Sequence, residues 1–353
     1  MDDWLSTFRG KRVLVTGHTG FKGSWLALWL HDLGAEVTGF ALPPDGDQTH
    51  FSLLGLDRLI RHVAGDIRDI DAVTKVFAEA RPEIVIHLAA QALVRRSYAE
   101  PKLTFDTNIG GSVNILEAVR TTPSVRVLVY ITSDKSYLNK EWPWGYRETD
   151  ELGGRDPYGA SKACAELVFA AYAAAYFEGD NSPGIASTRA GNVIGGGDWS
   201  ADRIVPDCIR AFRQGNSIVL RNPDATRPWQ HVLEPLSGYL MLASSLYRNP
   251  RLHRGSWNFG PPLESSCPVG VLAEKIVTAW GSGTVRVDRP ADMPHEDRLL
   301  HLNTDKARLD LGWKPRWSID RTVTETIGWY KAVGQGRPAL EVSRSQIKAY
   351  AES

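Results

Sequence analysis

The sequence has few cysteines, no excess charge of either sign and no long apolar run. Only three of its 353 residues are cysteine, namely Cys164, Cys208 and Cys267. They are far apart and form no CxxC pair, so neither a disulfide framework nor a zinc knuckle is expected, and no metal site is predicted. Lysine plus arginine and aspartate plus glutamate both number 41. This balance argues against nucleic acid or an acidic membrane surface as a partner.

Two further absences bear on where the protein works. The most apolar helical stretch, 25–30, is far too short to cross a bilayer. The first four residues, Met1 to Trp4, are acidic where a signal peptide would be basic, and no apolar run follows them. A reducing, cytoplasmic setting is therefore expected, and the low cysteine content also favours it.

The first half of the chain alternates β-rich runs with amphipathic segments. A helix at 21–33 has apolar residues at helical spacing and Gly34 as its stop. Continuous apolar runs such as 127–129 predict strands that are buried on both faces. Strands are expected at 12–16, 36–41, 60–64, 83–88, 126–132 and 184–189. The fold class is therefore α/β, a doubly wound parallel sheet of the Rossmann type.

After residue 190 this rhythm breaks, which predicts a second and smaller unit. The three glycines at 195–197 indicate a loop, whereas a helix at 233–246 and a strand near 257–259 are expected to return to the sheet. From Pro261 onward, short helices and turns are expected. The predicted division is a Rossmann domain of 1–190 plus about 228–260, and a mixed α/β C-terminal substrate lobe of about 191–227 plus 261–353.

A glycine-rich segment joins the first strand to the first helix. Glycines at this place allow a tight turn, so that backbone N–H groups at the helix start can hold a pyrophosphate. The strand before it and the helix after it favour this reading over a merely structural turn. The residues expected to bind the cofactor here are Gly17, His18, Gly20, Phe21, Lys22 and Gly23.

The ends of the later strands are expected to complete the cofactor site. Asp66 would accept a hydrogen bond from the adenine amine, and small residues at 89–90 lie where the cofactor would pass, although ordinary helix–sheet packing also explains them. The end of the second strand, 39–43, has neither an acid for a ribose hydroxyl nor an arginine for a 2′-phosphate. That end therefore does not choose between NAD and NADP. The full set expected here is Asp66, Ile67, Ala89, Ala90, Gln91 and Asn108.

The segment 156–162 indicates a helix start that carries catalytic side chains. Asp156 suits the cap and Pro157 the first helical position. Tyr158 and Lys162 then lie at i and i+4 on one face. The ammonium is expected to lower the pKa of the tyrosine from ~10 toward neutrality, so that it acts as a base. With the glycine loop, this pair predicts hydride exchange between a substrate and a nicotinamide cofactor.

At this point the chain resembles the extended short-chain dehydrogenase/reductase family. The fifth strand ends in Thr132, Ser133, Asp134 and Lys135, where the nucleotide-sugar 4,6-dehydratases of that family carry Thr-Asp-Glu. The Ser-Asp-Lys form is similar to that of the branch acting on CDP-glucose. The segments 17–25, 189–199 and 227–232 also carry the resemblance, which runs nearly the length of the chain.

The resemblance implies a reaction and a role for each of five residues. The sugar is oxidised at C4, water is lost across C5 and C6, and hydride returns to C6, with CDP-glucose as substrate and NAD regenerated. Tyr158 would take the proton of the 4-hydroxyl, Ser133 would hold that oxygen, and Lys162 would hold the ribose and Tyr158. Lys135 would remove the C5 proton, and Asp134 would protonate the departing hydroxyl.

Alternatives remain for Lys135 and for the whole chain. A base must be neutral, and lysine ordinarily titrates at ~10.4; burial and Lys162 would lower that pKa, whereas Asp134 would raise it. The other reading makes Lys135 a salt-bridge partner or an anchor for substrate phosphate. For the whole protein, the alternatives are a nucleotide-sugar epimerase or decarboxylase, which would not need this acid/base pair, and a non-catalytic NAD-binding regulator.

Cations are also expected for the substrate diphosphate. A guanidinium suits phosphate because its planar fork binds bidentately. The candidates are Arg203, Arg227 and His295, with Asn192, Trp229 and Ser133 completing the expected substrate set.

Two long helical segments, 101–120 and 158–177, bear on assembly. The second is rich in alanine and aromatic residues. The pair resembles the helices that family members bury in a dimeric four-helix interface, so a homodimer is expected as the smallest unit.

Overall fold

The centre of the molecule is a seven-stranded sheet, in a computed structural model that describes residues 3–288 and 299–353. Its strands are β1 (Arg12–Thr16), β2 (Glu36–Ala41), β3 (Arg61–Ala64), β4 (Ile84–His87), β5 (Val127–Ile131), β6 (Gly184–Ala190) and β11 (Gly255–Phe259). All are parallel, in the order β11-β6-β5-β4-β1-β2-β3. The order reverses between β1 and β4, and in such sheets ligands bind in the crevice at the carboxyl ends of these strands. The predicted fold class is confirmed.

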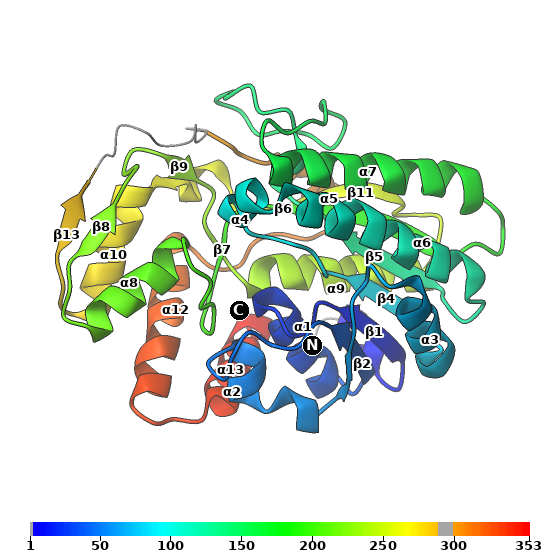
Figure 1. Cartoon of the computed structure of the whole chain (residues 1–353), viewed down its shortest axis with the longest axis horizontal. Helices are drawn as coiled ribbons and strands as arrows, with labels where there is room; N and C mark the ends of the chain where they lie inside the picture. Colours follow the sequence, from blue (N-terminus) through cyan, green and yellow to red (C-terminus); the bar gives the residue numbers. More distant parts are fainter. Residues whose placement is uncertain (1–2, 289–298) are drawn as a thin grey trace.

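Helices cover both faces of this sheet, as Figure 1 shows. Alternate residues of a strand point to opposite faces, and both sets are apolar here. Leu14 and Leu128 pack with one group of helices, whereas Val13 and Val129 pack with the other. The first group is α3 (Ile70–Ala80), α6 (Ser112–Thr121) and α7 (Pro157–Tyr176), and the second includes α1 (Phe21–Asp32) and α9 (Leu233–Arg248).

The helix predicted at 101–120 is interrupted in the middle. It begins as α5 (Pro101–Phe105), passes through one π-helical stretch, η3 (Asp106–Gly111), and continues as α6. A π-turn inserts one residue into a helix and is often found at a functional site. Here it buries Asn108 beside the carboxyl end of the sheet.

Short elements connect the longer ones around the sheet. They are η1 (Asp3–Phe8), α2 (His50–Leu54), η2 (Leu56–Arg58), α4 (Val94–Ala99), η4 (Asp134–Ser136), η5 (Leu263–Ser265) and α11 (Asp305–Leu309). Of these, η4 follows β5 directly and carries the expected acid/base pair.

A second group of elements lies beyond one end of the sheet, at the left of Figure 1. Its small strand pairs are β8 (Ile218–Leu220) with β13 (Val285–Val287), β7 (Val193–Ile194) with β10 (Gln230–His231), and β9 (Thr226–Arg227) with β12 (Cys267–Pro268). Helices α8 (Ile204–Arg213) and α10 (Val269–Trp280) pack together there. The return of β11 to pair with β6 confirms the strand predicted near 257–259.

The expectation of only short helices after Pro261 is wrong. Helices α10, α12 (Ile319–Gly334) and α13 (Ala339–Ala351) have 12, 16 and 13 residues. Each buries one apolar face: α10 packs on α12, and α13 packs on α1 and α2. Tertiary burial of an amphipathic face stabilises such helices more than intrinsic propensity does.

One hydrophobic core runs from the sheet into the C-terminal elements. Val13 and Ile86 of the sheet belong to the same buried cluster as Leu272 and Trp313. The division into a cofactor domain and a substrate lobe stays a prediction. Among the described residues, none of the helices is both long enough and apolar enough to span a membrane.

Candidate active site

The glycine loop forms a cradle between β1 and α1. Gly17 has φ +75°, and a Cβ added there would lie 2.7 Å from the backbone nitrogen of Ala89. A Cβ on Gly23 would overlap the Gly17 carbonyl oxygen. Helix α1 begins at Phe21, and no side chain caps its first turn. The N–H groups of this turn are therefore open to an anion, which fits the predicted pyrophosphate.

The His18 side chain leaves the loop and packs at the end of β2. Its ring lies where a Cβ of Gly39 would be, and its Nε2 is 2.7 Å from Nδ1 of His62. Burial, together with His62, lowers the pKa of His18 to about 3, so the imidazole is neutral. The part of His18 in the cradle is therefore its backbone.

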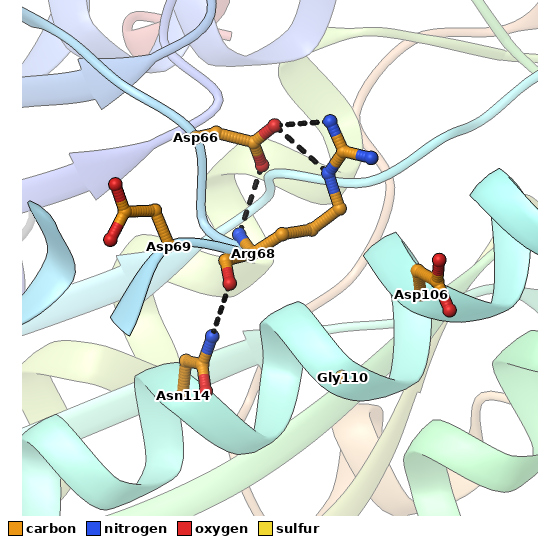
Figure 2. A pocket seen from close by; sticks show the side chains of 6 residues that line it. All are labelled: Asp66, Arg68, Asp69, Asp106, Gly110 and Asn114. Atoms are coloured by element: carbon orange, nitrogen blue, oxygen red, sulfur yellow. Dashed lines mark hydrogen bonds and ion pairs between the residues drawn. The ribbon is translucent and has the colours of Figure 1, made fainter. Parts of the chain in front are cut away.

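At the expected adenine end there is a hollow of about 550 Å³ (Figure 2). Asp66 is held there by Arg68, whose backbone N–H and Nε each donate to a different carboxylate oxygen at 2.9 Å. The hydrogen bond from Arg68 lowers the pKa of Asp66, which keeps the carboxylate ionised as an acceptor. The buried Ile67 side chain lies under Gly111. The hollow is lined by Asp66, Arg68, Asp69, Asp106, Gly110 and Asn114.

Gln91, after β4, and Asn108, in η3, hydrogen-bond each other. The Asn108 side chain accepts from the Gln91 N–H at 2.8 Å and donates to the Gln91 carbonyl at 3.0 Å. It also donates to Ser161 of α7 at 2.8 Å. The two half-buried alanines, Ala89 and Ala90, precede Gln91 beside Gly17. These hydrogen bonds hold Gln91, Asn108 and Ser161 together, and direct contact of the two alanines, Gln91 and Asn108 with a cofactor stays a prediction.

The start of α7 places the tyrosine and lysine as predicted. The Asp156 carboxylate caps the helix by accepting from the N–H groups of Tyr158 and Gly159, both at 3.0 Å. Tyr158 and Lys162 are buried one turn apart. Ser133, at the end of β5, hydrogen-bonds the Tyr158 hydroxyl and is 3.0 Å from Oδ1 of Asp134. The four groups therefore meet at the carboxyl end of the sheet.

The expected effect of Lys162 on Tyr158 is absent. Burial raises the pKa of Tyr158 to about 12, and the hydrogen bond from Ser133 opposes that rise only in part. The Lys162 ammonium donates instead to the Ile131 carbonyl at 3.4 Å. Burial and the charge of Lys22 lower the pKa of Lys162 to about 8. The prediction that Lys162 lowers the tyrosine pKa is therefore wrong, because desolvation outweighs the nearby charges.

Three cations act electrostatically on the carboxylate of Asp134. The carboxylate is only 4 % exposed, and burial raises its pKa, while Lys135, Lys22 and Arg227 act to lower it. Burial and the charge of Arg203 lower the pKa of Lys22 to about 8, whereas Asp134 acts to raise it. A buried carboxyl group with a raised pKa can donate a proton, and the cations suit an anionic substrate.

The two expected phosphate-binding arginines have different surroundings. The Arg203 side chain makes no capping hydrogen bond at the start of α8. Instead, its Nη1 pairs with Oδ2 of the buried Asp198 at 2.8 Å. Arg227 is buried and donates to the Thr226 carbonyl at 3.0 Å. Both act electrostatically on the site, Arg203 on Tyr158 and Arg227 on Asp134.

The other expected substrate residues are less directly placed. Trp229 packs in the core with 5 % of its surface exposed, and its indole N–H donates to the Cys267 carbonyl at 3.2 Å. That leaves little of the ring for a nucleobase. Asn192 is half-buried, and its carbonyl accepts from Gln230. His295 lies outside the described residues. Within the described ranges, no group of three or more His, Cys, Asp or Glu could hold a metal ion.

One buried pair behind the site was not predicted from the sequence. Glu166 of α7 and Arg189 of β6 form an ion pair that is almost fully buried. The available signal was spacing, because Glu166 lies four residues after Lys162 and therefore on the same helix face.

Comparisons with known proteins agree with this geometry. The family model for GDP-mannose 4,6-dehydratase matches residues 14–326. The chain is 46% identical to a CDP-glucose 4,6-dehydratase of Salmonella typhimurium over 97% of each protein. It is 31% identical to a CDP-paratose 2-epimerase of Salmonella typhi, over 91% of this chain and 100% of the relative.

Solved structures show the same fold. A dTDP-glucose 4,6-dehydratase from Streptomyces venezuelae, crystallised with NAD, superposes with a TM-score of 0.77 at 23% identity, over 93% of this chain and 99% of that one. Together with the sequence matches, this shows that the chain belongs to the GDP-mannose 4,6-dehydratase family of nucleotide-sugar dehydratases, within the extended short-chain dehydrogenases/reductases.

Proposed function

We propose that this protein converts CDP-D-glucose to CDP-4-dehydro-6-deoxy-D-glucose, with NAD as an internally recycled cofactor. The observation that carries the proposal is the position of Asp134, a buried acid next to Ser133 and beside Tyr158. Oxidation at C4 alone needs only the serine, tyrosine and lysine. An additional proton donor at the same place suits elimination of water, and the similarity to a CDP-glucose 4,6-dehydratase supports this reading.

The cofactor groove takes NAD through the glycine loop and the uncapped first turn of α1. Bound NAD would supply the hydride chemistry that oxidises C4 of the sugar and later reduces C6. Tyr158 removes the proton of the 4-hydroxyl, Ser133 holds that oxygen, and Lys162 orients the cofactor ribose.

Once C4 is a ketone, the C5 proton becomes acidic. Lys135 removes that proton, and Asp134 gives its own proton to the leaving 6-hydroxyl, so that water departs; when hydride reaches C6, Lys135 returns a proton to C5. Arg203 and Arg227 neutralise the substrate diphosphate, and Asn192 and His295 are further substrate contacts, whereas the buried Trp229 offers the substrate only the small exposed part of its ring.

The assembly belongs to the same proposal. Helix α7 exposes Leu167 (60 %), and the exposed alanines Ala170, Ala171 and Ala174 lie on the same face of the helix. An exposed apolar face of this kind suits a helix of a second copy, so we propose a homodimer built on α7 and α6. The cytoplasm is the proposed location, and the substrate lobe is the discontinuous unit defined from the sequence.

The experiment that tests the function is incubation of the purified protein with CDP-glucose and NAD, with the product followed by mass and by NMR. The expected product has lost one water, and carries deuterium at C5 when the reaction is run in D₂O. No reduced cofactor accumulates in step with product. Tyr158→Phe abolishes turnover, and the same assay with dTDP-glucose and GDP-glucose measures the preference for the base.

Two outcomes contradict the proposal. A product of unchanged mass with one inverted stereocentre identifies an epimerase. No conversion of CDP-, dTDP- or GDP-glucose by folded protein that binds NAD excludes the dehydratase reading.

A further inference from the structure

A bidentate ion pair lies directly behind the proposed active site. Nε and Nη2 of Arg189 each donate to a different carboxylate oxygen of Glu166, both at 2.9 Å. Burial acts to raise the pKa of Glu166, but the hydrogen bonds and charge of Arg189 outweigh it and lower that pKa. The carboxylate is therefore ionised and a strong acceptor.

The same carboxylate accepts a hydrogen bond from Thr132, which directly precedes the catalytic segment 133–135. The Thr132 hydroxyl donates to Oε1 of Glu166, and the Ser187 hydroxyl donates to Oε2 at 2.8 Å. Thr132 lies between the end of β5 and Ser133, whereas Ser187 is in the middle of β6. One oxygen thus points to the catalytic segment and the other to the interior of the sheet.

The guanidinium contacts Tyr137, which lies two residues after the catalytic segment 133–135. Nη1 of Arg189 donates to the Tyr137 hydroxyl at 2.7 Å and to the Glu148 carbonyl at 3.1 Å. Tyr137 directly follows η4. The ion pair therefore contacts the chain on both sides of 133–135, at Thr132 before it and at Tyr137 after it.

Helix α7 is attached at two successive turns to two successive residues of the strand end. Lys162 donates to the Ile131 carbonyl, and Glu166, one turn later, accepts from Thr132. Tyr158 lies one turn before Lys162 on the same face. A shift of α7 along its axis would break both attachments, so they set the position of Tyr158 relative to Ser133.

We propose that Glu166 and Arg189 are positioning residues, which hold the segment 133–135 in register with Tyr158 and Lys162 through the hydroxyl of Thr132. This inference rests on the proposed function for its catalytic reading. Buried ion pairs by themselves add little net stability. A displacement of about 1 Å in a catalytic group costs on the order of a hundredfold in rate. The ion pair is therefore expected to act on the rate, because it fixes the position of the catalytic groups.

The test removes one contact of the carboxylate and leaves the ion pair intact. Thr132→Val takes away the hydroxyl that joins Glu166 to the catalytic segment. Ser187→Ala is the matched control, because it takes away a hydroxyl from the other oxygen of the same carboxylate. Thr132→Ser restores the hydroxyl and is the rescue variant. For each, kcat and KM for CDP-glucose, NAD affinity by calorimetry, and Tm are measured.

We expect Thr132→Val to lower kcat about tenfold or more, with KM and NAD affinity within about twofold of wild type. Ser187→Ala keeps its kcat within about twofold although it loses a comparable amount of Tm, and Thr132→Ser recovers most of the rate. Equal losses of kcat in Thr132→Val and Ser187→Ala, or failure of the rescue, overturn the proposal.

Crystal structures of the two variants supply a readout that needs no turnover. Ser133 and Asp134 are expected to move relative to Tyr158 in Thr132→Val and to stay in place in Ser187→Ala. Unmoved residues in both variants refute the positioning role. Absence of wild-type turnover on CDP-glucose defeats the proposed function instead, and the crystallographic comparison still decides this one.

Discussion

The guanidinium of Arg203 donates a hydrogen bond from Nη1 to Oδ2 of Asp198 at 2.8 Å. The Asp198 side chain is almost fully buried, whereas that of Arg203 is 35% exposed. The same guanidinium acts electrostatically on Tyr158 and Lys22. Arg203 is thus anchored to the fold on one side and turned toward the reacting groups on the other.

Because of this anchoring, Arg203→Gln is expected to lower both stability and substrate affinity. Asp198 would remain buried without its cation, which costs about 1–3 kcal/mol. Urea unfolding measures that loss, and KM for CDP-glucose measures the loss of a phosphate contact. Arg227→Gln is the comparison, because Arg227 is the other arginine proposed to bind the diphosphate, and its guanidinium donates to the Thr226 carbonyl. A purely destabilising effect of Arg203→Gln, with unchanged KM, would remove Arg203 from the substrate site.

Asp134→Asn separates oxidation from elimination. The amide keeps the size of the side chain but has no proton to give to the leaving hydroxyl, so turnover falls by about 10²–10⁴. Oxidation at C4 remains available, so the absorbance of reduced nicotinamide is expected to appear without loss of water from the sugar. Rapid-mixing absorbance and product mass measure the two steps. Retention of wild-type turnover would show that another group protonates the hydroxyl.

Lys22→Met is expected to stabilise the cofactor-free protein in a pH-dependent way. The pKa of Lys22 is lowered from 10.5 to about 8 by burial and Arg203. Below pH 8 the wild type therefore carries the full penalty of a buried charge, at most about 3–4 kcal/mol at 1.36 kcal/mol per pKa unit. Between pH 8 and 10.5 the unfolded chain binds the proton that the folded chain has lost, so the stability of the wild type rises with pH.

The gain from Lys22→Met should therefore be largest at pH 7 and shrink toward pH 10, as measured by urea unfolding at both values. Lys11→Met is the control. The hydrogen bond with Tyr247 raises the pKa of Lys11, so its removal brings no such gain. A gain that does not vary with pH would mean that Lys22 is not charged at a cost in the folded chain.

Gly23→Ala tests the cofactor cradle. The added methyl group would overlap the Gly17 carbonyl oxygen, so the loop must open. We expect NAD affinity, measured by calorimetry, to fall about tenfold or more, which corresponds to about 1.4 kcal/mol. In Gly20→Ala the same methyl would be 3.3 Å from that oxygen, and the loss should be much smaller. Equal losses in the two variants would contradict the cradle.

Leu167→Glu tests the proposed dimer. In a dimer built on α7, the substitution buries a carboxylate at the interface of both copies, so the protein is expected to run as a monomer in size-exclusion chromatography with light scattering. Leu309→Glu, at a similarly exposed leucine of α11, is the control and should leave the assembly unchanged. An unchanged oligomer in both variants would move the interface away from α7.

The sheet could be predicted closely because its strands are buried on both faces. In β1, β4 and β5 the strand appears as a nearly uninterrupted apolar run between loops. The predicted range 126–132 differs from β5, Val127–Ile131, by one residue at each end. The interruption at η3 could not be predicted, because a π-turn leaves no mark in composition. Helix α12 was missed although Val323, Ile327 and Tyr330 have helical spacing, so there the signal was present in the sequence.

Some features of the candidate site could likewise be predicted from the sequence, and others could not. Tyr158 and Lys162 were predictable because their relation is local, a spacing within one helix. The approach of Lys22 and Arg227 to Asp134 brings together segments far apart in the chain, and no periodicity encodes it. The pKa of Tyr158 was predicted with the wrong sign because the degree of burial, which dominates it, is a property of the folded chain.

The return of β11 to the edge of β6 has a consequence for synthesis on the ribosome. The chain leaves the sheet at Ala190 and rejoins it at Gly255. At roughly 5–20 residues per second, the intervening stretch takes on the order of several seconds to emerge. During that interval β6 is an edge strand with unpaired backbone groups, and all seven of its residues, which are buried in the folded chain, are uncovered. The nascent chain therefore passes through a period in which its sheet is open to aggregation, and a chaperone that shields this edge would raise its folding yield.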